Sequence, residues 1–127
     1  MGDLTHSFSL SEFACHDGTP VPAELLPNVQ QLANNLEVLR DRVGVPIHIV
    51  SGYRTPAHNA LVDGAGHSQH MLAKAADIQV QGMAPKQVCA LVKQLIADGQ
   101  MAQGGVGLYD NWVHYDVRGT PARWGGA

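Results

Sequence analysis

The sequence predicts an α+β fold in which a small, mainly antiparallel sheet is flanked by helices. Two segments, Pro22 to Val43 and Pro85 to Ala97, carry apolar residues at alternating steps of three and four, the spacing of an amphipathic helix. Short segments with the alternating pattern of strands separate and follow these helices. Helices and strands do not alternate strictly enough for a doubly wound parallel sheet, so the α+β class fits better.

The first long helix has sequence signals at both ends. Pro27 fits only near its start, and Gly44 followed by Pro46 stops it. Before it, Ser9 is placed to cap a short helical turn that has Glu12 in its acidic first turn. The helix is therefore expected to be preceded by a separate short turn.

The remaining elements are short. Segments expected to form strands are 46–50, 77–80, 106–109 and 112–117. A short helix is expected from Pro56 to Val62, and the glycine-rich composition of 63–66 indicates a flexible loop. The last two strands are joined by a turn at Asp110-Asn111. These short strands together give the small sheet.

Composition indicates one globular domain. The chain has 127 residues, of which 45% are hydrophobic and 15% charged, a balance that favours one packed core. We expect a single domain over residues 1–127, with an ordered core from about residue 8 to residue 124, and a monomer. The net charge of -3 and the pI of about 6.1 argue against a nucleic-acid partner, which requires a basic surface.

Nothing in the sequence indicates a membrane protein or a secretion signal. No run of apolar residues is long enough to span a bilayer, and the segment from Met1 to Phe13 lacks the basic and then apolar layout of a signal peptide. We therefore expect synthesis in the cytoplasm. Cys15 and Cys89 are far apart and have no CxxC spacing, so free, buried thiols are expected rather than a disulfide or a thiolate metal site.

Two segments contain candidate metal ligands. In the last expected strand, His114 and Asp116 share one face, which is either a functional face or an ordinary solvated one. Earlier in the chain, His70 precedes Asp77 at the start of a strand. Imidazole and carboxylate are usual zinc ligands, and a catalytic site typically takes three from the protein and leaves one position to water. One zinc ion held by His70, Asp77 and His114 would meet that pattern.

Three motifs occur in a characteristic order along the chain. They are Ser-Gly-Tyr-Arg-Thr-Pro at 51–56, Ser68-x-His70 followed by Asp77, and Trp-Val-His-Tyr-Asp at 112–116. In this order they resemble the zinc D-alanyl-D-alanine carboxypeptidase family, which also includes phage L-alanyl-D-glutamate endolysins and the D,D-dipeptidases of vancomycin resistance. The similarity extends from Phe8 nearly to Trp124. It is closest to the short, single-domain branch found in phages and prophages.

The resemblance implies a hedgehog/DD-peptidase type of α+β fold and a zinc peptidase. It implies that His70, Asp77 and His114 bind the metal, and that Arg54 is a catalytic and substrate-binding residue that reaches a carboxylate or carbonyl oxygen. The implied substrate is a peptidoglycan stem peptide, cut by a D-Ala-D-Ala carboxypeptidase or an L-Ala-D-Glu endopeptidase acting on the cell wall. Manganese, cobalt or nickel remain alternatives to zinc for this ligand set.

Two more residues are expected at the substrate site. His67 lies close to His70 in sequence, and Ser68 is placed either to contact substrate or to stabilise a turn. Ala73 stands where a glycine is common in the family. We expect this change only to restrict the local backbone.

The chain departs from the family at the catalytic base. Characterised members carry an acidic residue or histidine three positions before the last zinc ligand, and that position is Asn111 here. Asparagine cannot accept a proton, so we assign to Asp116 either proton transfer or the orientation of His114. Asp110 and His67 are weaker candidates. Asn111 also favours the alternative function, a non-catalytic zinc-containing module that binds the cell wall or belongs to a virion.

Overall fold

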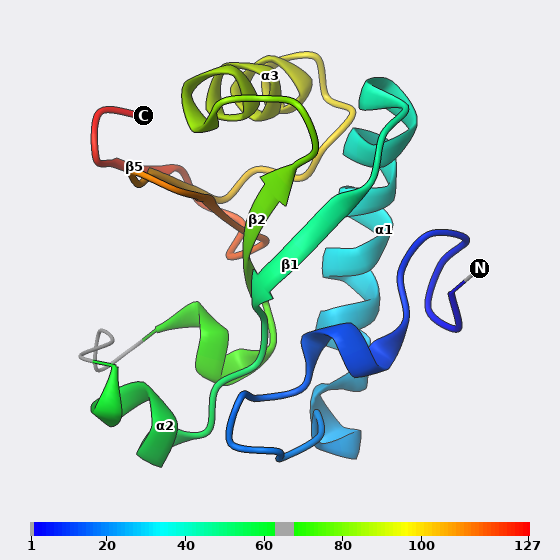
Figure 1. The fold of residues 1–127 in the computed structure, drawn as a ribbon, viewed down its shortest axis with the longest axis vertical. Coiled ribbons are helices and arrows are strands. Elements are labelled where there is room, and N and C mark those ends of the chain that lie inside the picture. Colours follow the sequence, from blue (N-terminus) through cyan, green and yellow to red (C-terminus); the bar gives the residue numbers. More distant parts are fainter. Residues whose placement is uncertain (1, 63–67) are drawn as a thin grey trace.

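The helices and strands are arranged as an α+β fold, which confirms the expected class (Figure 1). The computed structural model describes residues 2–62 and 68–127. In these residues the α-helices are α1 (Leu26–Val43), α2 (Pro56–Leu61) and α3 (Pro85–Ala97). The strands are β1 (Ile47–Ser51), β2 (Ala75–Val80), β3 (Gly105–Leu108), β4 (Val113–Asp116) and β5 (Ala122–Trp124).

The strands form one mixed sheet with the order β1-β2-β4-β3-β5. The β1–β2, β2–β4 and β3–β4 pairs are antiparallel, while β5 runs parallel to β3 at the edge. In the centre of the sheet, Asp77 of β2 lies directly opposite His114 of β4. Residues directly opposite each other in neighbouring strands project from the same face. The register therefore brings these two side chains together.

The other face of the sheet packs against α1 and α3 to form the core. From α1 the fully buried side chains include Val29, Leu32, Leu36 and Leu39, and from α3 they include Val92 and Leu95. The sheet contributes Ile78, Val113 and Tyr115, which alternate along their strands with the polar residues of the opposite face. This alternation leaves the face that carries Asp77 and His114 uncovered by α1 and α3.

Several element boundaries match the expectations and others differ. Helix α3 has the expected bounds, whereas α1 begins only at Leu26 because the preceding Ala23–Leu25 forms a 3₁₀ turn. Pro27 lies in the first turn of α1, where its missing N–H leaves no hydrogen bond unmade. Strand β5 was not expected from the sequence. The expected loop at 63–66 lies outside the described residues.

The segment that precedes α1 is tied to that helix by a carboxylate. Glu37 accepts hydrogen bonds from the backbone N–H of Ser7 at 2.8 Å and from its hydroxyl at 2.7 Å. Phe8 and Phe13 of the same segment are buried in the core. Cys15 and Cys89 are free and buried, as expected.

In the part of the chain that the structure describes, no helix combines the length and the apolar character needed to cross a membrane.

Candidate metal centre

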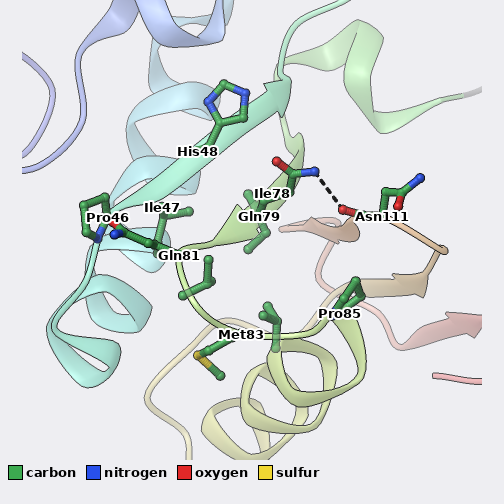
Figure 2. Close-up of a pocket in the computed structure, with 11 residues that line it drawn as sticks. Pro46, Ile47, His48, Ile78, Gln79, Gln81, Met83, Pro85 and Asn111 are labelled. Atoms are coloured by element: carbon green, nitrogen blue, oxygen red, sulfur yellow. Dashed lines mark hydrogen bonds between the residues drawn. The ribbon is translucent and has the colours of Figure 1, made fainter.

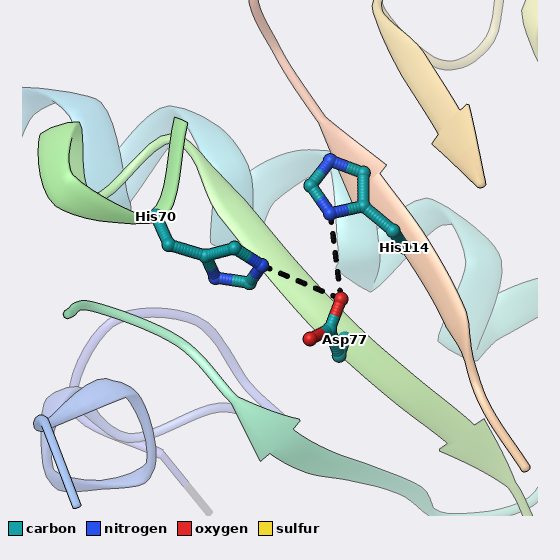
Figure 3. A group of neighbouring side chains, drawn as sticks. All are labelled: His70, Asp77 and His114. Carbon is teal, nitrogen blue, oxygen red and sulfur yellow. Dashed lines mark ion pairs between the residues drawn. The ribbon is translucent and has the colours of Figure 1, made fainter. Parts of the chain in front are cut away.

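The candidate ligands meet on the face of the sheet opposite α1 and α3 (Figure 3). They are His70, Asp77 and His114. Asp77 and His114 come from the central strands β2 and β4, and His70 comes from the 3₁₀ helix Gln69–Leu72 that precedes β2. All three side chains are buried, with relative exposures of 3%, 5% and 6% in sequence order. Three buried polar side chains at one point require partners, because an unpaired buried polar group is costly.

The three side chains point one atom each at a shared position. Oδ1 of Asp77 lies 3.4 Å from Nε2 of His70 and 3.4 Å from Nδ1 of His114. One donor atom from each residue lies within 4.8 Å of the other two. Residues 2–62 and 68–127 place no fourth imidazole, thiolate or carboxylate in this group. Two imidazole nitrogens and one carboxylate oxygen at this spacing fit a zinc ion, whose bonds to such atoms are about 2.0–2.2 Å long.

The orientation of His70 is set by the backbone. Its Nδ1 lies 2.7 Å from the carbonyl oxygen of Gly52, which only accepts hydrogen bonds. Nδ1 therefore carries the proton, and the lone pair of Nε2 faces Asp77. Ser68 caps the 3₁₀ helix by accepting a hydrogen bond from the backbone N–H of His70 at 3.2 Å. This contact shows Ser68 supporting the helix that carries His70.

Ala73 ends this helix in a left-handed conformation. Its φ is 56°, the only positive φ of a non-glycine residue in the described part of the chain. A side chain in this region costs roughly 1–2 kcal/mol, which explains why glycine suits the position. The expectation of a merely restricted backbone was therefore too mild. The turn at Ala73 leads from the 3₁₀ helix toward β2, and so links two of the candidate ligands.

The orientation of His114 is set by Asp116. Nε2 of His114 lies 2.7 Å from Oδ2 of Asp116, so Nε2 carries the proton and the Nδ1 lone pair faces Asp77. Asp116 is 0% exposed. Its carboxylate also accepts hydrogen bonds from the backbone N–H of Gly105 and from the guanidinium of Arg118. The alternative of an ordinary solvated face for His114 and Asp116 is therefore wrong.

The pKa values of these groups are shifted by burial and by their partners. Burial raises the pKa of Asp77, but the adjacent imidazoles of His114 and His70 outweigh it and hold this pKa below the ordinary value. Burial also raises the pKa of Asp116, and its bonds with His114 and Arg118 more than reverse the effect. Burial lowers the pKa of His114, whereas Asp116 and Asp77 raise it, with a net increase. The carboxylates are therefore charged and suited to a cation.

Arg54 lies beside the candidate ligands. Nη2 of its guanidinium is 3.3 Å from Oδ2 of Asp77, the carboxylate oxygen that does not face the histidines. Its Nε is 3.3 Å from the hydroxyl of Ser51, and its Nη1 is 3.4 Å from Oδ1 of Asn59. The side chain remains 16% exposed. Arg54 thus carries positive charge at the margin of the centre and holds Asp77 at the same time.

The other expected site residues lie in different surroundings. Asp110 and Asn111 are exposed in the turn between β3 and β4. The backbone carbonyl of Asn111 accepts a hydrogen bond from the side chain of Gln79 at 2.9 Å. His67 lies outside the described residues. Asp116 contacts His114, one of the three candidate metal ligands. Among the described residues it is the only one proposed as a proton acceptor that makes such a contact.

A cavity of about 530 Å³ lies next to Asn111 (Figure 2). It is bounded by β1, β2 and the start of α3, with side chains that include His48, Gln79, Met83 and Pro85. None of His70, Asp77 and His114 lines it. The cavity is therefore separate from the candidate ligands, although Gln79 of β2 lies only two residues beyond Asp77.

Sequence reasoning missed Trp124, which packs against the centre from β5. Its ring centroid is 4.8 Å from that of His114, and its Nε1 donates a hydrogen bond to the hydroxyl of Tyr109 at 2.9 Å. The guanidinium carbon of Arg118 lies 5.5 Å from the centroid of the indole. The only sequence signal is an aromatic residue, Trp124, in a short segment after the last expected strand. That segment is too short to show a repeating pattern of polar and apolar residues, so the sequence does not indicate that it forms a strand or contacts His114.

Comparison with known proteins assigns this fold and site to a family. Residues 6–116 match the family model described as Peptidase M15. The chain therefore belongs to the M15 peptidase family, and this membership implies a hydrolase that acts on a peptide. M15 peptidases are zinc-dependent, in agreement with the buried group of His70, Asp77 and His114. A search of curated proteins found no match to the chain.

Proposed function

We propose that this M15 peptidase uses one zinc ion to hydrolyse the stem peptides of bacterial peptidoglycan, as a D-Ala-D-Ala carboxypeptidase or an L-Ala-D-Glu endopeptidase. The observation that carries the proposal is the buried group of three ligand atoms, one from each of His70, Asp77 and His114, beside the cationic Arg54. The resemblance of its motifs to the short branch found in phages and prophages supports a role in degrading the cell wall.

The ligand set supports a catalytic rather than a structural metal. His70 would contribute Nε2, Asp77 Oδ1 and His114 Nδ1. Structural zinc sites are normally closed by a fourth protein ligand, and the described residues add none to this group. When bound, zinc would supply an acidified water for attack and a positive charge for the carbonyl oxygen of the scissile peptide.

The residues around the ligands determine which ring nitrogen of each imidazole carries the proton in the neutral form that binds metal. The carbonyl of Gly52 holds the proton of His70 on Nδ1, and Asp116 holds the proton of His114 on Nε2. In each ring the other nitrogen therefore presents its lone pair to the shared position. This arrangement prepares the site before the metal arrives.

Arg54 is placed to recognise the anionic end of a peptide. Its guanidinium is permanently charged and offers a planar pair of donors that matches a carboxylate. It is held by Asp77, Ser51 and Asn59 but retains exposed surface beside the centre. A substrate carboxylate or carbonyl oxygen bound there would lie next to the three ligands. Such placement converts binding energy into orientation of the scissile bond.

Of the two roles considered for Asp116, the orientation of His114 is the better supported. The carboxylate is fully buried and already accepts hydrogen bonds from His114, Gly105 and Arg118. A general base must reach the proton that it removes, within hydrogen-bond distance or through one water. The position of Asp116 behind His114 favours a residue that fixes the ligand rather than one that takes a proton from substrate water.

A second candidate function is a non-catalytic module that binds the cell wall. The exposed Asn111 favours it, because it stands where the family carries its base and cannot accept a proton. General-base help is typically worth 10²- to 10⁴-fold, so a chain without it has a reason to be inactive.

One experiment separates the two functions. The zinc-loaded protein is incubated with purified peptidoglycan and with peptides ending in D-Ala-D-Ala, and the products are identified by mass spectrometry. The metal-free protein is the control. Products cut at D-Ala-D-Ala or at L-Ala-D-Glu bonds, formed only with metal, support the peptidase and name its bond. Binding to the wall without any metal-dependent product would favour the binding module.

A further inference from the structure

Gly107, His114 and Trp124 lie in one row across the sheet. Gly107 of β3 is paired with His114 of β4 on one side and with Trp124 of β5 on the other. Directly paired residues project from the same face, so Trp124 and His114 stand on the same face with Gly107 between them. The face is the one that carries the candidate ligands.

Because Gly107 has no side chain, the indole of Trp124 can reach His114. A Cβ added at Gly107 would collide with Nε1, Cε2 and Cζ2 of Trp124, so the indole occupies the space above this glycine. The ring centroids of His114 and Trp124 are 4.8 Å apart, with an angle of 53° between the planes. The glycine in the middle of β3 is thus explained by close approach of a side chain rather than by its backbone conformation.

The indole is held by its own partners. Nε1 donates to the hydroxyl of Tyr109 at 2.9 Å, and the Arg118 guanidinium lies 5.5 Å from the ring centroid. The same guanidinium binds Asp116 at 2.8 Å, and Asp116 binds His114. Trp124, Arg118, Asp116 and His114 therefore form a closed set of contacts around one candidate metal ligand.

We propose that Trp124 is a positioning residue of the metal centre, which fixes the His114 ring and shields its hydrogen bond to Asp116 from water. The inference rests on the proposed binding of zinc by His114. A hydrogen bond in a less polar environment is stronger than the same bond in water, and partners behind a ligand typically change metal affinity 10- to 100-fold. Strand β5 lies beyond residues 6–116 of the family match, so a segment outside that match completes the centre.

Zinc affinity of substituted full-length chains tests this role. We expect Trp124→Ala to weaken zinc binding roughly tenfold in competition with a chelator, within the range known for partners of ligands. Trp124→Phe, which keeps a ring against His114, should retain most of the affinity. Gly107→Ala keeps the indole but displaces it, because the added methyl group collides with it, and should weaken binding in the same direction as Trp124→Ala.

A matched control separates positioning from the general attachment of β5. Arg123 is on the same strand and donates hydrogen bonds to the carbonyl oxygen of Gly104 at 2.6 Å and to the side chain of Gln103 at 3.0 Å, without contact to His114. Arg123→Ala should therefore bind zinc like the wild type. Cobalt substitution adds a second readout, since its visible spectrum should change in Trp124→Ala and stay unchanged in Arg123→Ala.

Circular dichroism establishes which variants are folded, and if Trp124→Ala is not, Gly107→Ala takes its place. Wild-type affinity in a folded Trp124→Ala and Gly107→Ala, or an equal loss in Arg123→Ala, would overturn the inference. Neither result depends on hydrolysis. A wild-type protein that binds zinc but cleaves no peptide would instead contradict the proposed function alone.

Discussion

His114 uses its two ring nitrogens for two different carboxylates: Nε2 lies 2.7 Å from Asp116, and Nδ1 faces Asp77 at 3.4 Å. Because the Asp116 carboxylate is ionised and only accepts, the proton is fixed on Nε2. His70 presents its other nitrogen, Nε2, to the same position. The two histidines therefore face one candidate metal position through different ring atoms, and each depends on a different partner.

Replacing Asp116 by asparagine should weaken the metal centre. The amide lacks the negative charge that holds the His114 proton, and zinc affinity should fall roughly 10- to 100-fold. The change also removes the charge that Arg118 binds, so the free energy of unfolding should fall by about 2 kcal/mol. Chelator competition and urea unfolding measure the two effects. Asp41→Asn, at an exposed position of α1, is the control, and unchanged affinity in Asp116→Asn would remove the orienting role.

Zinc should stabilise the folded chain through its ligands. At a free zinc concentration one hundred times the dissociation constant, binding to the folded state alone adds about 2.7 kcal/mol to the free energy of unfolding. His114→Ala should lose this gain, and His48→Ala, at an exposed imidazole of β1, should keep it. Thermal melts with zinc and with a chelator measure the difference. Equal stabilisation of His114→Ala and the wild type would place the metal elsewhere.

Arg54 should distinguish peptides by their C-terminal charge. Arg54→Lys loses the planar pair of donors, so kcat/KM should fall roughly tenfold or more on a peptide with a free carboxylate. The fall should be much smaller on the same peptide with an amidated end. Because Arg54 also holds Asp77, zinc affinity is measured in parallel to exclude loss of metal. An equal fall for both peptides would show that Arg54 does not bind the terminal carboxylate.

The contact between Glu37 and Ser7 should make stability depend on pH. Burial raises the pKa of Glu37, but the nearby hydroxyl of Thr5 and the hydrogen bonds from Ser7 lower it more, so its pKa in the folded chain is below the ordinary value. A depressed pKa means that the stabilisation is present above the pKa of the unfolded chain and is lost as pH falls through the folded pKa. At pH 7 the free energy of unfolding of the wild type should exceed that of Glu37→Gln by about 1 kcal/mol.

Urea unfolding at several pH values checks this prediction. The difference in the free energy of unfolding between the wild type and Glu37→Gln should shrink as the pH falls below 4.5, the ordinary pKa of a glutamate, and through the lower pKa of the folded chain. A difference that stays constant over this range would mean that the carboxylate charge contributes nothing to the contact.

Parts of the fold that depend on local signals were predictable. Helix α3 begins at Pro85 and has apolar residues at helical spacing, and its bounds were predicted correctly. Strand β5 has three residues and no periodicity of its own, and it is held by parallel pairing with β3, a contact between distant segments. Local pattern carries no information on such a pairing, so neither β5 nor the contact of Trp124 with His114 could be predicted.

The candidate site could likewise be predicted only where the signal lies within one segment of the sequence. The motifs indicated His70, Asp77 and His114, and the structure brings these three residues together. The burial of Asp116 was not predictable from strand alternation, which places it on the face away from the core. Its burial comes from Arg118 and from β3, where Gly105 leaves room for the carboxylate. Both are features of the assembled sheet rather than of one segment.

The two histidines differ in how easily mutation can disturb them. His70 is oriented by the main-chain oxygen of residue 52, which every amino acid possesses, so no change of side chain there deletes the acceptor itself. His114 is oriented by the carboxylate of Asp116, which one substitution in the gene removes. Loss of metal binding among descendants of this chain should therefore begin at His114 and its neighbours more often than at His70.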